Sequence, residues 1–90
     1  MKFEWDESKR EGNFSKHGLD FKWAYRVFES DTFTFEDNRI AYNEQSFVTL
    51  GMLDGDVVVV VHTETNDKIR VISLRKAVKN EQKLYFTHIG

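Results

Sequence analysis

The sequence predicts one two-layer α+β domain, in which a mostly antiparallel sheet of four to five strands carries helices on one face. The chain of 90 residues is long enough for a single domain with one modest core, which we place at 1–90. Stretches in which every second residue is apolar, as in strands, follow one another through 32–75 with short turn-like breaks. Helix-like stretches come before and after that run. The expected order is therefore β-α-α-β-β-β-β-α, because tight turns join antiparallel strands and the helices group together.

The N-terminal third is expected to hold a short edge strand and two helices. The strand lies at 3–5, and a helix at 6–17 is capped by Asp6 and ended by Gly18. A second helix is expected at 20–29, because its apolar residues recur with helical spacing. These apolar residues are Phe21, Ala24, Tyr25 and Phe28.

The rest of the chain is expected to form four strands and a final helix. Strands are predicted at 32–36 and 46–52, whereas the intervening segment 39–45 fits no regular pattern and is expected to be a loop. Two β-branched runs then flank Asn66-Asp67, which favours a hairpin with a two-residue turn. The period changes to helical after Arg75, which predicts a C-terminal helix of about three turns.

Counting back from the turn of that hairpin predicts which side chains share a face. Thr65 pairs with Lys68, and the residues expected to be buried under the helices are Val59, Val61, Ile72 and Leu74. The opposite face mixes valines with His62, Ser73 and Arg75, and a substrate could lie there. The core is expected to be completed by Phe21, Ala24, Phe28, Phe33, Phe35, Val48 and Leu50.

Composition narrows the functional classes. There is no cysteine, and the three histidines have no ligand spacing for zinc, so no metal and no other cofactor is expected. The N-terminus has no apolar signal core and no apolar run reaches transmembrane length, so a cytoplasmic chain that does not contact membranes is expected.

Charge is distributed unevenly along the chain. Residues 29–67 hold one basic and nine acidic side chains, whereas residues 68–90 hold six basic and one acidic. A basic patch of this kind can meet phosphates although the whole chain has a net charge of -2. The alternative is a solvated helix face that binds nothing.

The residues that remain for chemistry are His, Lys, Arg and Tyr, since no nucleophile motif or phosphate-binding loop is present. This set suits metal-free RNA cleavage, in which a base deprotonates the ribose 2′-hydroxyl, cations stabilise the phosphorane and an acid protonates the leaving oxygen. Lys9, Asn13 and His17 share a helix face, with Lys16 close by. That face is either a solvated surface or a row of donors aimed at phosphate.

Two separated motifs resemble those of the BrnT family. The opening motif comprises Phe3-Glu4-Trp5-Asp6, Lys9, Asn13, Lys16-His17-Gly18, Phe21 and Ala24; the closing motif comprises 69–77, Glu81 and Tyr85, with the turn from Gly51 to Gly55 between them. BrnT proteins are ribonuclease toxins of type II toxin-antitoxin pairs, with a RelE-like fold. The resemblance therefore implies an RNA substrate, inhibition of translation and a cognate antitoxin similar to BrnA. It also implies that operator DNA is bound only through the antitoxin complex.

The resemblance also carries residues over to this chain. Lys9, Lys16 and His17 match the opening motif, and the closing motif is matched by Arg70, Ser73, Arg75 and Lys76. His17 is assigned as general acid or base, Arg75 as the phosphate-binding residue and Lys9 as a supporting cation. His62 joins the expected catalytic set through the hairpin register alone. The expected RNA-binding residues are Lys16, Arg70, Ser73 and Lys76.

Three departures from the family pattern leave alternatives open. Family members often carry arginine where this chain has Ser46, Asp56 and Thr65, and fewer cations weaken a surface for RNA. A catalytically weak module that acts only as antitoxin partner and co-repressor is therefore an alternative, and a plain structural domain is another. In these alternatives His17 only caps its helix, and Arg75 pairs with an acidic neighbour such as Glu44.

Overall fold

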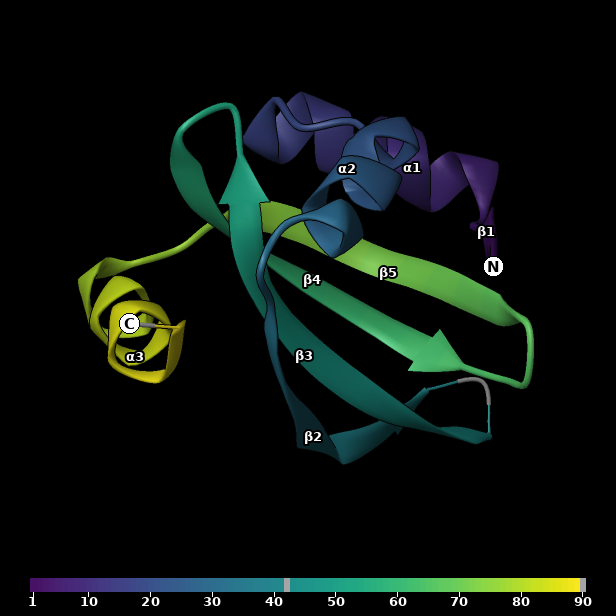
Figure 1. Ribbon diagram of the computed structural model, residues 1–90. Helices are drawn as coiled ribbons and strands as arrows, with labels where there is room; N and C mark the ends of the chain where they lie inside the picture. Colours follow the sequence, from purple (N-terminus) through teal and green to yellow (C-terminus); the bar gives the residue numbers. More distant parts are fainter. Residues whose placement is uncertain (42, 90) are drawn as a thin grey trace.

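The computed structural model describes residues 1–41 and 43–89 and has the predicted α+β fold (Figure 1). Five strands form one sheet in the order β1-β5-β4-β3-β2. The elements are β1 (Lys2–Glu4), α1 (Glu7–His17), the 3₁₀ turn η1 (Phe21–Trp23), α2 (Ala24–Glu29), β2 (Phe33–Ala41), β3 (Glu44–Leu53), β4 (Asp56–Glu64), β5 (Lys68–Lys76) and α3 (Lys79–Ile89). Strands β2 to β5 are antiparallel, and β1 pairs with β5 in parallel. The predicted element order is confirmed.

The N-terminal helix begins and ends where its capping residues predict. The carboxylate of Asp6 accepts a hydrogen bond from the backbone N–H of Lys9 at 3.1 Å, which satisfies a free donor of the first turn. Gly18 has a φ of 71°, and its N–H donates to the carbonyl of Phe14. The predicted helix at 20–29 is divided, because η1 precedes α2.

The expected loop at 39–45 is wrong for most of its length. β2 continues to Ala41 and β3 begins at Glu44, and these two residues pair across the hairpin. Asn43 has a φ of 59°, as asparagine tolerates in tight turns. Residue 42 lies outside the described residues. The pattern was obscured because β2 is irregular between Glu36 and Ile40.

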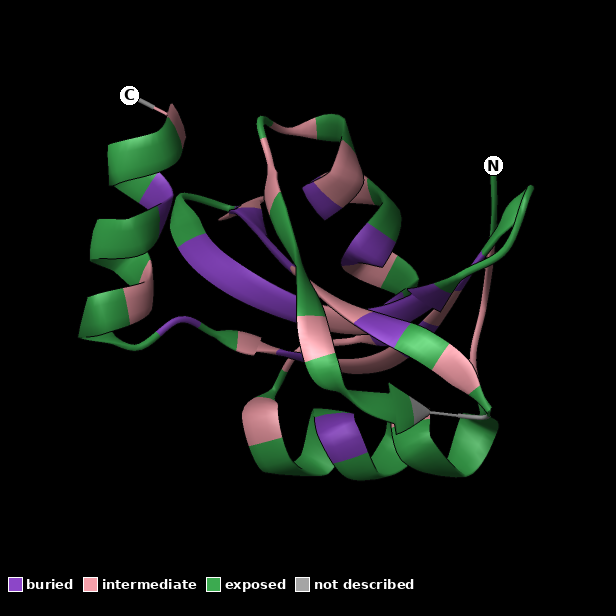
Figure 2. Ribbon diagram, turned by 90° about the horizontal axis from the view of Figure 1, so that it is seen from below, coloured by how far each residue is buried: buried purple, intermediate pink, exposed green. Residues whose placement is uncertain are grey.

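The sheet is buried from both sides rather than one, which differs from the expected arrangement of the helices. One core lies under α1 and α2, where Phe21, Ala24 and Val27 pack on the sheet. Its strand residues are Leu53, Val58, Val60, Ile69, Val71 and Leu74. On the opposite face Tyr85 of α3 packs against Leu50 and Val59. Figure 1 shows α3 on the opposite side from α1 and α2, and Figure 2 shows that the outer surfaces of α1 and α3 are mostly exposed.

The predicted hairpin register is correct near the turn and wrong beyond a bulge. The N–H of Thr65 donates to the carbonyl of Lys68 at 3.0 Å, and His62 lies opposite Val71, as predicted. The register then shifts because Ile72 is an extra residue in β5. From there on the observed pairs are Val61 with Ser73, Val60 with Leu74, Val59 with Arg75 and Val58 with Lys76.

The bulge changes which residues share a face. Leu74 joins Val60 under α1 and α2, whereas Ser73 and Arg75 lie with Val61 and Val59 on the opposite face. Val59 and Leu74 are buried as predicted, but on different faces. Val61 and Ile72 are only half-buried.

Most of the other expected core residues are confirmed. Phe21, Ala24 and Leu50 are fully buried. Three more are partly buried and pack against a core: Phe28, Phe33 and Val48. Phe35 is 38% exposed, so its prediction as a core residue is wrong.

Candidate functional site

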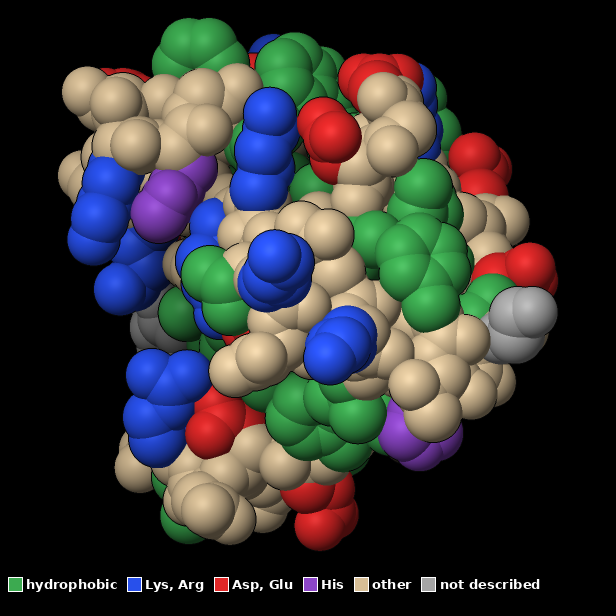
Figure 3. Space-filling view, turned by 90° about the vertical axis from the view of Figure 1, so that its left-hand side faces the viewer, with side chains coloured by type: hydrophobic (Ala, Val, Ile, Leu, Met, Phe, Trp, Pro, Cys, Tyr) green, Lys and Arg blue, Asp and Glu red, His purple; other side chains and the backbone are tan. Residues whose placement is uncertain are grey.

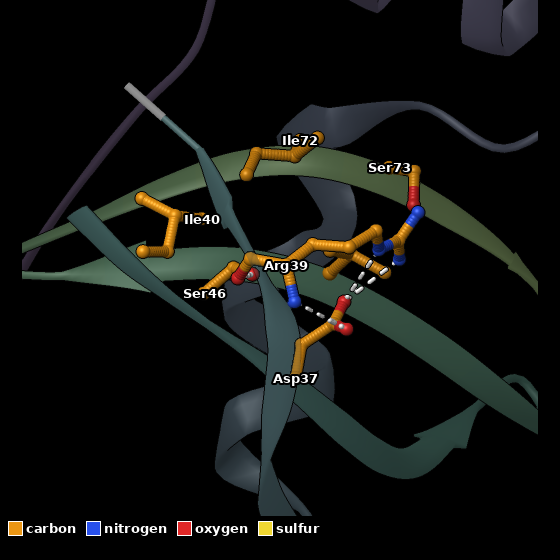
Figure 4. Close-up of a pocket in the computed structure, with 7 residues that line it drawn as sticks. Asp37, Arg39, Ile40, Ser46, Ile72 and Ser73 are labelled. Carbon is orange, nitrogen blue, oxygen red and sulfur yellow. Dashed lines mark hydrogen bonds and ion pairs between the residues drawn. The ribbon is translucent and has the colours of Figure 1, made fainter. Parts of the chain in front are cut away.

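The sheet face that carries α3 is only partly covered, because α3 packs over one end of it. Beside that helix lies a hollow of about 280 Å³ (Figure 4). Its lining residues are Asp37, Arg39, Ile40, Ser46, Val61, Ile72 and Ser73. We call this region the open face, and define it as these seven residues together with Arg70 and Arg75. Arg70 belongs to it because its neighbours Ile69 and Val71 both point into the core under α1 and α2.

Arg75 lies at the border between the open face and α3. Its two terminal nitrogens each donate to a carboxylate oxygen of Glu81 at 2.8 Å, which is the planar two-point contact that arginine favours. Glu81 also accepts from the N–H of Val78 at 2.9 Å. The hydrogen bonds from Arg75 lower the pKa of Glu81, and those to Glu81 raise the pKa of Arg75. The acidic partner is therefore on α3, and is not the Glu44 considered in the sequence.

Arg39 is a cation of the open face that the sequence did not single out. Its Nε and one terminal nitrogen donate to one oxygen of Asp37 at 3.0 and 2.7 Å, and its backbone N–H donates to the other oxygen at 3.2 Å. These hydrogen bonds hold the pKa of Asp37 below its usual range. The buried Ser46 donates its hydroxyl to the carbonyl of Arg39 at 2.6 Å. In Figure 4 the guanidinium of Arg39 points toward Ser73.

The cations at the two ends of β5 also face carboxylates. Arg70 pairs with Glu4 of β1 at 2.7 Å. Lys76 pairs with Asp56 at 3.5 Å, so one of the three departures from the family pattern is an ion-pair partner at this strand end. Figure 3 looks onto the side of the molecule that carries α3 and shows Lys and Arg side chains spread between exposed apolar ones.

Asn13 does not belong to the row of phosphate donors that the sequence predicted on α1. Asn13 is buried, and its amide donates to the carbonyls of Leu74 and Leu19 at 2.8 and 3.0 Å while accepting from the N–H of Leu74 at 3.2 Å. The amide of Asn13 is hydrogen-bonded to backbone groups, so it is not available to bind a phosphate. Lys9 and Lys16 are exposed, and His17 is half-buried in the last turn.

The predicted site residues therefore form two groups on opposite sides of the sheet. One group is on α1 and comprises Lys9, Lys16 and His17; the other is on β5 and comprises Arg70, Ser73 and Arg75. Both elements run in the same direction (Figure 1). Because Asn13 reaches Leu74, the next turn of α1 brings His17 toward the end of β5, where Lys76 lies.

His62 lies in the core and away from the open face. Its ring is fully buried between Phe28, with ring centres 5.1 Å apart, and Phe47, with ring centres 5.9 Å apart. Its Nε2 is 2.7 Å from the hydroxyl of Thr49. Burial lowers the pKa of His62 to about 4, so the neutral ring is favoured. The register shift at Ile72 explains why the sequence placed His62 beside Ser73 and the structure does not.

Among residues 1–41 and 43–89, no three His, Asp or Glu side chains gather as metal ligands would. In that same part of the chain no helix is long and apolar enough to cross a membrane.

Comparison with known proteins gives one family. A family model described as "Ribonuclease toxin, BrnT, of type II toxin-antitoxin system" matches residues 5–81, which is most of the 90-residue chain. A search of curated proteins found no match. The matched range contains α1, β2 to β5 and Glu81, the partner of Arg75.

Proposed function

The chain belongs to the BrnT family of ribonuclease toxins of type II toxin-antitoxin systems, and we propose that it inhibits translation by cleaving RNA without a metal ion. A system of this type includes an antitoxin partner. We infer that this partner resembles BrnA, that operator DNA is bound only through their complex and that the toxin acts in the cytoplasm.

The observation that carries the proposal is the fixed guanidinium of Arg75 at the end of β5. Two hydrogen bonds to Glu81 set its plane, while about a third of its side chain stays exposed (34%). A preorganised guanidinium that keeps its charge at every working pH suits a phosphate whose charge grows in the transition state. We assign Arg75 to that phosphate.

The proton transfers in the proposal belong to His17. A base removes the proton of the ribose 2′-hydroxyl, and the oxygen attacks the adjacent phosphorus to form a phosphorane. An acid then protonates the 5′-oxygen as its bond to phosphorus breaks, leaving a cyclic phosphate. His17 is assigned to one of these transfers because an imidazole can both accept and donate a proton, and because this residue lies toward the end of β5. Lys9 is the supporting cation, and the RNA-binding residues are Lys16, Arg70, Ser73 and Lys76.

A catalytically weak module that serves only as antitoxin partner and co-repressor is the second candidate, and one specific observation favours it. The cations along β5 face carboxylates: Arg70 meets Glu4, Arg75 meets Glu81 and Lys76 meets Asp56. Each pair weakens the attraction for phosphate, so the protein would bind its antitoxin without cleaving RNA efficiently.

The test is RNA cleavage at low salt by the wild type, His17→Ala, Arg75→Ala and Arg75→Lys, with and without a chelator and with and without ribosomes. Loss of a general acid or base should slow cleavage by roughly 10²–10⁴-fold. Arg75→Lys should recover little, because lysine lacks the planar fork. Arg26→Ala is the matched control, since this arginine pairs with Asp54 on the α2 side of the sheet.

Each outcome separates the candidates. Cleavage that survives the chelator and is lost in the folded His17 and Arg75 variants supports the proposal. Folded variants that cleave as fast as the wild type would show that the site is wrong. A wild type that binds its antitoxin but never cleaves RNA would favour the second candidate.

A further inference from the structure

The hollow in the open face has two chemically different parts. Its floor is aliphatic and consists of Val61 and Ile72 with Ile40 beside them, and Ile40 is 71% exposed. Its polar part consists of Asp37, Arg39 and Ser73, with the buried Ser46 next to Arg39 (Figure 4). A nucleotide has the same division, with an apolar base face and an anionic phosphate.

We propose that this hollow is a nucleotide-binding subsite for RNA, in which Arg39 binds a backbone phosphate and the aliphatic floor packs against the base. The subsite rests on the proposed function, because it extends the same strand of RNA from the phosphate held by Arg75. Ser73 and Arg75 are two residues apart on β5, roughly 7 Å, so the hollow and Arg75 are neighbours on one continuous surface.

An irregularity in β2 brings Arg39 to this surface. Glu36 pairs with Phe47 and Ile40 pairs with Gln45, so β2 carries more residues than β3 between the two pairs. Such bulges redirect side chains from the regular alternation. The backbone of Arg39 is then fixed at both ends, because Asp37 accepts from its N–H and Ser46 donates to its carbonyl. The guanidinium is therefore oriented before any ligand arrives.

The ion pair with Asp37 orients Arg39 without hiding it. The Asp37 side chain is only 13% exposed, whereas that of Arg39 is 75% exposed. An approaching phosphate thus meets the guanidinium and not the carboxylate. In the pair between Arg26 and Asp54 the order is reversed, since the arginine is 39% exposed and the aspartate 67%. Arg26 is therefore the control: it is also an arginine paired with an aspartate, but in this pair the aspartate is the more exposed partner.

The test is binding of a fluorescent single-stranded oligonucleotide whose 2′-hydroxyls are methylated, so that it cannot be cleaved. Fluorescence anisotropy over a range of salt concentrations would compare the wild type with Arg39→Ala, Arg39→Gln, Arg39→Lys and Arg26→Ala. Arg39→Ala and Arg39→Gln should lower the affinity by about fivefold or more and reduce the slope of log affinity against log salt by about 0.7, the share of one phosphate contact. Arg39→Lys should keep the slope, and Arg26→Ala should keep both quantities.

A substitution in the aliphatic floor of the hollow gives a second, independent test. Ile72→Ala should weaken binding of the oligonucleotide while leaving its salt slope unchanged, because it removes apolar contact and no charge. Circular dichroism checks that each variant is folded, and Arg39→Gln retains a hydrogen-bond donor toward Asp37.

The outcomes distinguish the subsite from the proposed function. A wild type that binds the oligonucleotide through Arg39 but cleaves no natural RNA leaves the subsite standing and overturns the cleavage. The subsite would be overturned if Arg39→Ala kept the wild-type affinity for the oligonucleotide and the wild-type salt slope. It would also be overturned if Arg26→Ala lost as much affinity as Arg39→Ala. If the Arg39 variants bind RNA as the wild type does but no longer bind the co-expressed antitoxin, the hollow is a binding site for the protein partner instead.

Discussion

The two faces of the sheet use polar groups in opposite ways. Under α1 and α2 the polar side chains are buried and bonded to neighbours in fixed positions, as with Asn13 on the backbone of β5 and His62 beside Thr49. On the open face the charged side chains are partly exposed and paired on the surface, as with Arg75 and its partner Glu81. Buried polar groups cost several times more to leave unpaired than exposed ones. We therefore expect the first face to determine stability and the second to determine activity.

β5 contributes to both faces, and its bulge decides how. Leu74 and Val71 both point to α1 and α2 although they are three residues apart, because Ile72 is inserted between them. Ser73 and Arg75 are thereby directed to the open face. The comparison of the two faces can be tested by substitutions on each side.

The largest expected loss of stability is for Asn13→Ala. The substitution removes one acceptor and two donations from the buried amide and leaves the N–H and carbonyl of Leu74 without this partner. The free energy of unfolding should fall by roughly 2–4 kcal/mol, because each buried backbone group left unpaired costs about 1–3 kcal/mol. Urea denaturation measures it. Asn80→Ala, an exposed position on α3, is the control and should change stability little.

The second effect is a dependence of stability on pH through His62. Its pKa is about 4 in the folded protein and 6.5 ordinarily, so the unfolded chain binds the proton more readily. This contribution to stability is complete above pH 6.5 and is lost as the pH falls toward 4. Between about pH 7.5 and about pH 5 the loss should be about 2 kcal/mol.

The matched variant for that prediction is His62→Gln, which has no titrating ring. It should be less stable than the wild type near neutral pH but lose less stability on acidification. Equal slopes of unfolding free energy against pH in the two proteins would refute the role of His62.

The smallest expected effect on stability belongs to the open face. Glu81→Gln replaces an ion pair whose side chains are 26% and 34% exposed, so the free energy of unfolding should change by less than about 1 kcal/mol. The same variant should alter RNA cleavage more than stability, because it loosens the orientation of Arg75. A loss of stability as large as that of Asn13→Ala would remove the distinction between the two faces.

Local signals in the sequence predicted the elements of the fold, whereas long-range pairing determined the site. Asp6 and Gly18 are readable as helix ends because capping depends on neighbouring residues only. The bulge at Ile72 is not readable, since the partner strand β4 contains five consecutive valines and therefore keeps an apolar face in either register. That single shift placed Ser73 on the opposite face of the sheet from His62, whose own partner Val71 is the predicted one.

The remaining differences also depend on distant contacts. Arg39 reaches the open face only through the irregular pairing of β2 with β3, and Glu81 meets Arg75 only because α3 packs on that face. The role of Asn13 depends on a partner 61 residues away in the sequence. A weak signal for Arg39 did exist, since it is the only basic residue in 29–67.

The amide of Asn13 has a further consequence for self-assembly. β1 pairs with only Lys68, Ile69 and Arg70, and beyond these residues Asn13 engages both backbone groups of Leu74 in the manner of a neighbouring strand. The side chain thus occupies backbone groups to which a second chain would otherwise hydrogen-bond. The two edge strands differ in length, since β1 has 3 residues and β2 at the opposite border has 9. We therefore expect another polypeptide to extend the sheet more readily along β2 than along the border formed by β1 and Asn13.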